Sequence, residues 1–357
     1  MGRLSHHRGP LSLVLLGVAF LAILGACSAP QTTFDPRSDT ADNIHTLYIL
    51  VIVVSGAVGA VVLLAMGYLL FRFRARPGVP ARQIHGNSKL EVAWTLGPIL
   101  LLIMVGVPTV FGIVGAARAP SADAILITVT AHQWWWEVDY EGLGPDGGSL
   151  ATANEIHIPV GREVAIHLES DDVIHSFWVP ALIGKVDAVP NHPNDLPVFT
   201  AKEIGSFYGQ CAEFCGAAHA LMRFRVIVEP LADFERWVSA LQTPPPPPDQ
   251  GTFVASGQAI FISSCSRCHT VFGTPAAGKA GPDLTLFGER LTLGAGIMDN
   301  TPENVEAWVT DLRAIKPIPE GLLGGRADRE AMPTFAGTLS KDEIAAVTAY
   351  IQSQTID

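Results

Sequence analysis

Four residues with metal-binding side chains stand within twelve positions of one another: Cys211, Cys215, His219 and Met222. A fifth, His175, lies 36 positions before Cys211. Two thiolates, two imidazoles and one thioether form a soft ligand set that suits copper or zinc. A structural zinc site would leave Met222 without a role, because a thioether is not among the usual ligands of zinc. A mononuclear blue-copper site uses one cysteine, so the second cysteine favours two copper ions bridged by both thiolates.

A second group of reactive residues forms the sequence Cys265-Ser266-Arg267-Cys268-His269. C-x-x-C-H is the attachment motif of c-type haem, in which the cysteines form thioethers to the haem and the histidine binds the iron. The C-x-x-C spacing alone also occurs in redox-active and zinc-binding sites. The adjacent histidine and about 100 residues of mostly helical pattern around it favour haem.

The sixth ligand of such a haem is expected to be a methionine. Residues 251–357 offer Met298 and Met332. Met332 stands just before the last helical segment, in a sequence that resembles small bacterial cytochromes c. We therefore predict Met332 as the ligand and Met298 as a residue that fills a gap in the core. By the same resemblance, residues 251–357 form a complete all-α class I cytochrome c domain.

Composition shows what kind of chain carries these residues. Of 357 residues, 48% are hydrophobic and only 16% are charged, with a mean hydropathy of +0.32. Proteins average about 25% charged residues, so this deficit indicates membrane segments and speaks against disorder. The net charge of −11 gives no support for binding nucleic acid, and none is expected as a partner. Five cysteines are too few for a disulfide framework.

Two apolar runs, 46–71 and 92–117, each contain 26 residues without a charge. As helices they would extend about 39 Å, enough to cross a hydrocarbon core of about 30 Å. Buried helices of soluble proteins rarely run so far without a charge. Five basic residues precede the first acid of the connecting loop, which predicts that the loop is cytoplasmic and that both ends of the hairpin lie outside. These residues are Arg72, Arg74, Arg76, Arg82 and Lys89.

Residues 1–26 are predicted to be an export signal. Arg3 and Arg8 precede an apolar segment, and small residues then precede Cys27. The arrangement resembles a bacterial lipoprotein signal, in which Cys27 would become the lipidated N-terminus of the mature protein. An ordinary cleaved signal and an uncleaved anchor are the alternatives. An export signal places the start of the hairpin outside, which agrees with the topology predicted from the basic loop.

Beyond the hairpin the pattern changes to short strands. Apolar residues alternate at 125–129, 156–160, 164–168 and 223–228, which predicts a β-sandwich or barrel. Residues 244–248 are five prolines that form a stiff spacer of about 15 Å. The sequence 340–343 is typical of a capping box before a helix. The predicted domains are the signal at 1–26, the hairpin at 27–118, a β-domain at 119–242, a linker at 243–250 and the cytochrome c domain at 251–357.

The spacing C-x-x-x-C-x-x-x-H-x-x-M, with the upstream histidine and a tryptophan-rich segment before it, resembles subunit II of cytochrome c oxidase. The resemblance covers the two-span hairpin and the whole β-domain. It implies an all-β cupredoxin-like sandwich that holds a binuclear copper centre, CuA. The implied ligands are Cys211 and Cys215 as bridging thiolates, His175 and His219 on one copper each, Met222 as a weak thioether ligand, and Glu213 through its backbone carbonyl.

The resemblance implies two further roles. The carboxylate of Glu213 would reach a magnesium or manganese ion at the interface with subunit I, or else be a solvated loop acid. Trp134, in the segment 132–136, would be the residue at which electrons reach the copper domain. Core packing or a place at the membrane surface is the alternative for a tryptophan cluster. Trp135 replaces the tyrosine that is commoner in the family, and Asn191-His192 replaces a common Pro-Gly-Arg.

We therefore predict a multi-domain membrane protein of the caa3 oxidase type, with a two-helix transmembrane hairpin, a copper domain and a fused cytochrome c domain. Electrons from cytochrome c or a cytochrome bc-type donor would pass through haem c and CuA to the haem–copper site of subunit I. Subunit I reduces oxygen and pumps protons, so this chain has no catalytic residue of its own. Subunit III is a further expected partner. The expected location is the bacterial inner membrane, with both redox domains on the periplasmic or extracellular side.

Other interpretations share part of this pattern. The copper subunit of a haem–copper nitric-oxide reductase has the same ligand set. Quinol oxidases have lost the copper ligands, which disfavours them. An exported copper chaperone needs an open site, and both the filled ligand set and the covalent haem argue against one.

Overall fold

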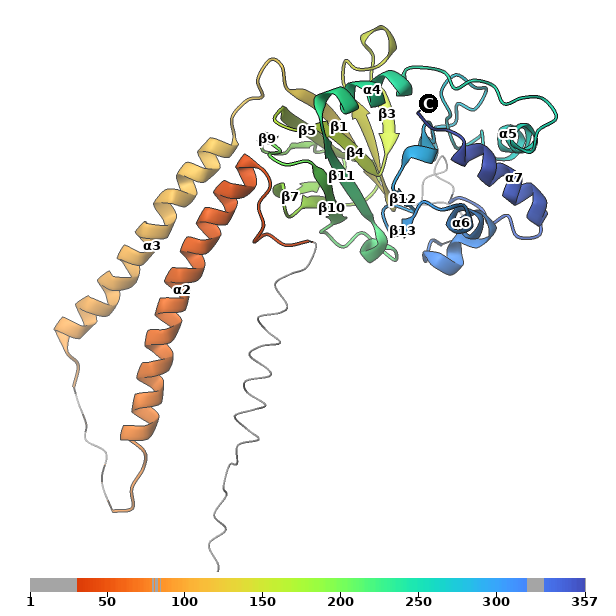
Figure 1. Cartoon of the computed structure of the whole chain (residues 1–357). Coiled ribbons are helices and arrows are strands. Elements are labelled where there is room, and N and C mark those ends of the chain that lie inside the picture. Colours follow the sequence, from red (N-terminus) through yellow and green to blue (C-terminus); the bar gives the residue numbers. More distant parts are fainter. Residues whose placement is uncertain (1–30, 79, 81–82, 84, 320–330, 357) are drawn as a thin grey trace, which may run out of the picture.

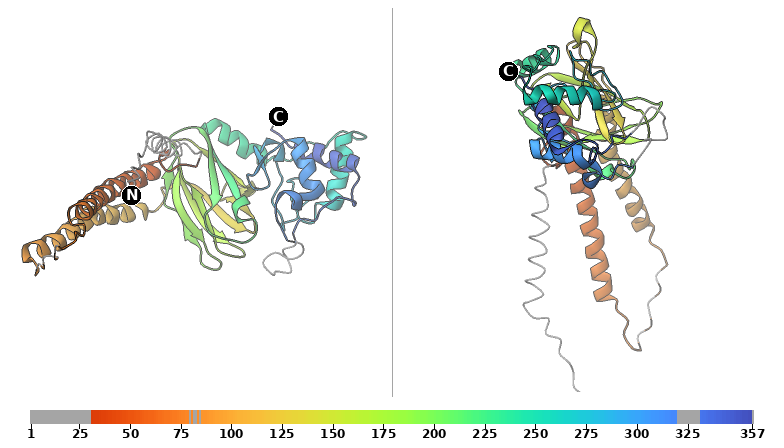
Figure 2. Two further views of the ribbon diagram at one scale, coloured as in Figure 1. Left: turned by 90° about the horizontal axis from the view of Figure 1, so that it is seen from below. Right: turned by 90° about the vertical axis from the view of Figure 1, so that its right-hand side faces the viewer.

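The computed structural model describes residues 31–78, 80, 83, 85–319 and 331–356. In this part of the chain a helical hairpin, a β-sandwich and a helical domain follow one another, with the sandwich in the middle (Figures 1 and 2). The predicted export signal and Cys27 lie outside the described residues. The three bodies have the class predicted from the sequence.

The hairpin consists of α2 (Asp39–Arg72) and α3 (Ser88–Ala116). Both helices are long and apolar enough to cross a membrane, and their most apolar stretches are exposed. Helix α3 continues through both of its prolines. Ser38 caps α2 by accepting a hydrogen bond from the amide of Ala41, and its hydroxyl donates to the carbonyl of Leu182 in the β-domain. The first membrane helix is therefore joined at its start to the sandwich.

The sandwich has two sheets. The first contains, in spatial order, β3 (Leu150–Ala153), β2 (Trp135–Tyr140), β1 (Ile125–His132), β5 (Glu163–Ser170) and β8 (Asn194–Asp195), and β9 (Phe199–Thr200) also pairs with β5. The second contains β4 (Glu155–Pro159), β11 (Arg223–Glu229), β10 (Gly205–Cys211), β6 (His175–Val179) and β7 (Ile183–Ala188). Short helical turns lie at η1 (Pro145–Gly147) and η2 (His219–Leu221).

The alternating residues of the strands fill the space between the sheets. In β1 the side chains of Ile127, Val129 and Ala131 are buried, and β1 runs parallel to β5 with Ile127 opposite Ile166. Because successive side chains of a strand point to opposite faces, this burial confirms the predicted period of two. Helix α4 (Leu231–Leu241) then covers one edge of the core through Trp237, whose ring lies 5.3 Å from that of Tyr140.

The C-terminal domain is built from α5 (Phe253–Ser264), α6 (Pro302–Ile315) and α7 (Lys341–Gln352), with a turn at η3 (Phe287–Glu289). A small hairpin of β12 (Thr292–Leu293) and β13 (Met298–Asp299) interrupts the helices. Ser340 and Glu343 form the predicted capping box of α7. Gly257 allows α5 to cross α7 closely, because a Cβ there would lie 1.9 Å from the carbonyl oxygen of Ala346.

The C-terminal domain packs directly on the sandwich as well as being tied to it by the proline linker. Leu286 belongs to the hydrophobic core of the sandwich. The amide of Arg223 in β11 donates to the carbonyl of Ala295 beside β13, at 2.9 Å. The sequence predicted a tether between two domains, and the structure adds a built interface.

Candidate metal centres

The predicted copper ligands come from two neighbouring strands and one loop. His175 begins β6 and Cys211 ends β10, and these strands pair in the second sheet. Cys215, His219 and Met222 follow in the loop that leads through η2 to β11. The amide of Cys211 donates to the carbonyl of Met222, which closes the loop at its base.

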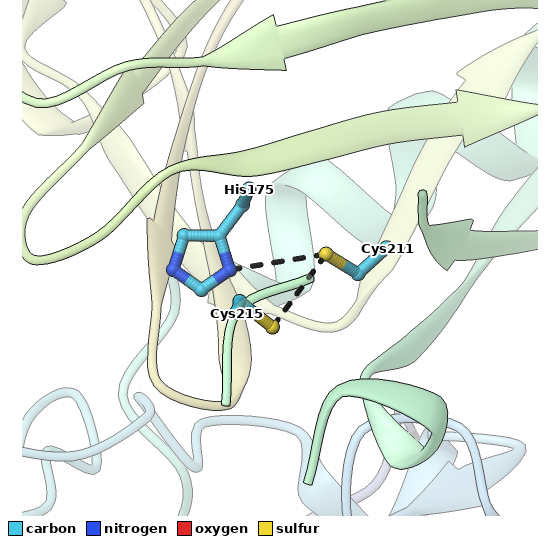
Figure 3. A group of neighbouring side chains, drawn as sticks. All are labelled: His175, Cys211 and Cys215. Atoms are coloured by element: carbon cyan, nitrogen blue, oxygen red, sulfur yellow. Dashed lines mark hydrogen bonds between the residues drawn. The ribbon is translucent and has the colours of Figure 1, made fainter. Parts of the chain in front are cut away.

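The ligand atoms converge on the two sulfurs, which lie 3.7 Å apart. His175, Cys211 and Cys215 point toward one another in Figure 3. Each histidine presents Nδ1 to one thiol, and the thioether and a backbone carbonyl complete the set. The distances are 3.9 Å from Cys211 Sγ to His175 Nδ1, 3.6 Å from Cys215 Sγ to His219 Nδ1, 3.9 Å from Cys215 Sγ to Met222 Sδ, and 3.2 Å from Cys211 Sγ to the carbonyl oxygen of Glu213.

The pKa values of the two buried thiols are shifted in opposite directions. A hydrogen bond from the thiol of Cys215 lowers the pKa of Cys211 well below its usual range. The Cys211 sulfur so close by then raises the pKa of Cys215 far above its usual range. The site thus favours one thiolate in the protein alone, and a second requires positive charge between the sulfurs. Copper ions bound by soft sulfur and imidazole ligands supply that charge, so these residues fit a binuclear copper site.

Asp172 orients His175, and the sequence analysis missed it. The Nε2–H of His175 donates to the Asp172 carboxylate at 2.8 Å, which directs Nδ1 at the sulfurs. The same carboxylate accepts the amide hydrogens of Gln133 and Val173, each at 2.6 Å. A carboxylate behind a metal-binding histidine is a common device for fixing the ring. The available signal was an aspartate three positions before the histidine.

The haem motif lies where α5 ends. Cys265 caps the helix, and His269 follows with its Nδ1–H donating to the carbonyl of Pro282 at 2.8 Å. This bond leaves Nε2 as the free ligand atom, and burial lowers the pKa of His269, so the ring is neutral. Gly281 makes room for the ring, since a Cβ there would lie 2.9 Å from His269 Cε1.

Two adjoining cavities surround His269, and Trp308 and Met332 line both of them. The inner cavity lies among residues of the cytochrome domain and is bordered by Cys265. The outer cavity lies between this domain and the sandwich and is bordered by Cys268. Apolar walls, a histidine with a free Nε2 and a methionine shared by both cavities fit a haem held between Met332 and His269. Met298 is not among the described residues that line either cavity, and it packs beside the core of the domain.

Trp134 connects the two sites. Its side chain is 4% exposed and lines the outer cavity together with His269. Its indole Nε1–H donates to the carbonyl of Cys215 at 3.0 Å, and Gln133, which the sequence analysis did not single out, donates to the same oxygen at 2.8 Å. Trp136 is a core residue, fully buried and 5.7 Å from the ring of Phe177. The alternative of core packing therefore holds for Trp136.

Comparisons with known proteins agree with this arrangement. Three family models match the chain: "Cytochrome C oxidase subunit II, transmembrane domain" at residues 30–111, its "periplasmic domain" at 144–229, and "Cytochrome C oxidase, cbb3-type, subunit III" at 253–351.

Similar proteins are known along the whole chain. Cytochrome c oxidase subunit 2 of Alkalihalophilus pseudofirmus is 37% identical over 95% of this chain and 96% of its own. The subunit of the same name from a Bacillus species is 33% identical over 96% and 97% of the two chains. The crystal structure of the periplasmic domain of oxidase subunit II from Bradyrhizobium japonicum is 33% identical, covers 35% of this chain and 96% of its own, and has a TM-score of 0.32. This chain is a two-pass membrane protein that belongs to the cytochrome c oxidase subunit II family.

Proposed function

We propose that the chain is the electron-transfer subunit of a caa3-type terminal oxidase. It receives electrons at haem c in residues 251–357, passes them through CuA, and delivers them to the oxygen-reducing site of subunit I. The observation that supports this order is the position of Trp134. One side chain borders the haem cavity and hydrogen-bonds the carbonyl of the copper ligand Cys215.

The residues around both sites favour electron transfer over substrate chemistry. When bound, the copper pair and the haem iron would each exchange one electron. His175, Cys211, Cys215 and Met222 are buried and His219 is half-buried, so the chain keeps water away from most of the proposed copper ligands. Asp172 holds one imidazole and the carbonyl of Pro282 holds another, each by its second nitrogen. Rigid, dry ligands keep the rearrangement between oxidation states small.

The finer assignments follow the same proposal. The metal ligands are His175, Cys211, Glu213, Cys215, His219 and Met222 for copper, and Cys265, Cys268, His269 and Met332 for haem. The Glu213 carboxylate would share a magnesium or manganese ion with subunit I. Phe214, 77% exposed and 5.8 Å from the His219 ring, supports a contact between this loop and another subunit.

The remaining assignments concern the domains and their surroundings. Helix α4 ends at Leu241 and α5 begins at Phe253, which supports a linker at 243–250. We also propose the export signal, lipidation of Cys27, the periplasmic side for both redox domains, subunit III as a partner, and cytochrome c or a bc-type complex as the donor.

Metal analysis and the identity of the co-purified subunits test this function. The membrane complex should contain two coppers and one covalent haem per chain, show one unpaired electron shared by two copper nuclei, and consume oxygen. One copper, or zinc, per chain would contradict the copper assignment. Reduction of nitric oxide without oxygen consumption would point to a nitric-oxide reductase, and release of copper to an acceptor protein would point to a chaperone.

A further inference from the structure

The interface between the sandwich and the cytochrome domain contains two reciprocal buried contacts. From the sandwich, Glu155 is 1% exposed and accepts three hydrogen bonds from the β12 segment. Its Oε1 accepts from the amide and hydroxyl of Thr292, both at 2.8 Å, and its Oε2 accepts from the amide of Leu291 at 3.1 Å. Each carboxylate oxygen therefore has a donor in the other domain.

From the cytochrome domain, Lys316 makes the matching contact in the opposite direction. It caps α6, is 2% exposed, and reaches across the interface. Its Nζ donates to the carbonyl oxygen of Trp134 at 2.8 Å and to that of Gly294 at 3.0 Å. Lys316 also lines the outer cavity beside His269. It thus touches the residue that links the two redox sites.

Such contacts make the docking geometry specific. A buried polar side chain without a partner loses hydration and gains nothing in return, so a small shift of the interface is costly. All three donors to Glu155 come from the cytochrome domain, and the Trp134 carbonyl that accepts from Lys316 comes from the sandwich, so a shift of the interface would leave both charged groups short of partners. An encounter surface for a passing protein would instead carry exposed charges with loose partners.

We propose that Lys316 and Glu155 are positioning residues that hold the cytochrome domain on Trp134, so that electrons reach copper from the fused domain and a soluble cytochrome is excluded from this surface. The inference rests on the proposed function. In the step concerned, one electron leaves the reduced haem and reduces the copper pair, and no atom is transferred. Neither residue touches a metal ligand through its own hydrogen bonds, so each acts through the position of Trp134 and of the β12 segment.

The test uses the complete membrane complex with two variants. Lys316→Met keeps the aliphatic stem and removes both donors. Glu155→Gln keeps the size but turns an amide NH₂ toward a backbone N–H, which removes an acceptor. Lys341→Met on α7 and Glu235→Gln on α4 are matched controls, because both side chains are exposed and make none of the interface hydrogen bonds described above. Glu155→Gln keeps the test decisive if Lys316→Met does not fold.

Three measurements are made on each protein. Hydrogen exchange at the amides of Leu291 and Thr292 should accelerate by about fivefold or more in Glu155→Gln, since losing a buried hydrogen bond costs about 1 kcal/mol or more. Flash-induced transfer from haem to copper should slow by a similar factor in both variants, with unchanged midpoint potentials. Added soluble cytochrome c should begin to reduce copper directly, at a rate proportional to its concentration.

The outcomes separate the inference from the proposed function. If both variants match the wild type in hydrogen exchange and in haem-to-copper electron transfer, and soluble cytochrome c still does not reduce copper, the positioning role is wrong. A wild-type complex whose copper is reduced by soluble cytochrome while the fused haem lags would overturn the proposed order of transfer itself. Slower internal transfer together with new access for soluble cytochrome supports both.

Discussion

The indole nitrogen of Trp134 donates to the carbonyl oxygen of Cys215 at 3.0 Å, across 81 positions of sequence. The bond joins the wall of the haem cavity to the copper loop. Because Lys316 also holds the Trp134 carbonyl, the residue is fixed at both its backbone and its side chain. Hydrogen bonds to both domains therefore fix the position of Trp134.

Trp134→Phe should slow internal electron transfer while both metal sites still load. Phenylalanine keeps an aromatic ring but cannot donate to the carbonyl of Cys215, so the two sites lose their shared hydrogen bond and internal transfer should slow several-fold. Flash kinetics on the purified complex measures the rate, and potentiometry checks that the midpoint potentials are unchanged. Trp237→Phe on α4 is the control, because that ring stacks on His157 at 4.3 Å and is not among the described residues that line either cavity. Equal rates in both variants would show that Trp134 has no special position.

Asp172→Asn should weaken copper binding by about 10–100-fold, the usual effect of removing the partner of a metal-binding histidine. The amide is a poorer acceptor for the His175 N–H, and its NH₂ group opposes the Gln133 amide hydrogen. Competition with a copper chelator measures the change. Asp195→Asn is a matched control, since Asp195 pairs with the surface residue His167. Retention of copper at the wild-type level would exclude an orienting role.

Met332→Ala should abolish the weak sulfur-to-iron absorption band of the oxidised haem, whereas Met298→Ala should leave it unchanged. The reason is that Met332 lines both cavities beside His269, whereas Met298 is not among the described residues that line them. Visible spectra of the two variants decide between them. Loss of the band in Met298→Ala alone would identify Met298 as the ligand.

Docking of the cytochrome domain should strengthen as the pH rises above about 7. Burial lowers the pKa of Lys316 to about 7, with the nearby Cys215 sulfur acting in the opposite direction. An exposed lysine has a pKa of about 10.4. At a pH between these two pKa values, Lys316 therefore gains a proton when the domain undocks. The docking equilibrium should therefore rise by up to about tenfold per pH unit between about 7 and 10, and level off below 7 where both states are protonated.

Protection of the Leu291 amide from hydrogen exchange, corrected for the intrinsic pH dependence of exchange, follows this equilibrium. Lys316→Met has no titrating group at the position and should show no such rise. If wild-type protection stays flat from pH 7 to about 9, Lys316 is not buried in the docked state.

The proposed metal-binding residues could be grouped from the sequence because their spacing is local. Four of the proposed copper ligands fall within twelve positions, and C-x-x-C-H is contiguous, so short motifs contain most of the proposed chemistry. The period-two strands and the capping box of α7 are local for the same reason. Asp172 carried only a weak signal, since an aspartate near a histidine is common on any surface.

The interface could not be predicted, because it depends on complementarity between surfaces that lie far apart in the sequence. Lys316 and Trp134 are 182 positions apart, and Glu155 and Thr292 are 137 apart. In sequence each charged residue resembles an ordinary solvated side chain. Only the folded surfaces show that Glu155 finds three donors, and Lys316 one carbonyl, on the other domain.

The cap of helix α2 also joins this apolar helix to the strand that carries a proposed copper ligand. Ser38, the N-cap of α2, donates a hydrogen bond to the carbonyl of Leu182, which lies in the turn after β6, the strand that His175 begins. The path from the membrane helix to a metal ligand is thus a few residues of rigid backbone. A change in the tilt of α2 would be carried to the copper loop, so bilayer thickness becomes a variable that acts on the alignment of this centre with its acceptor.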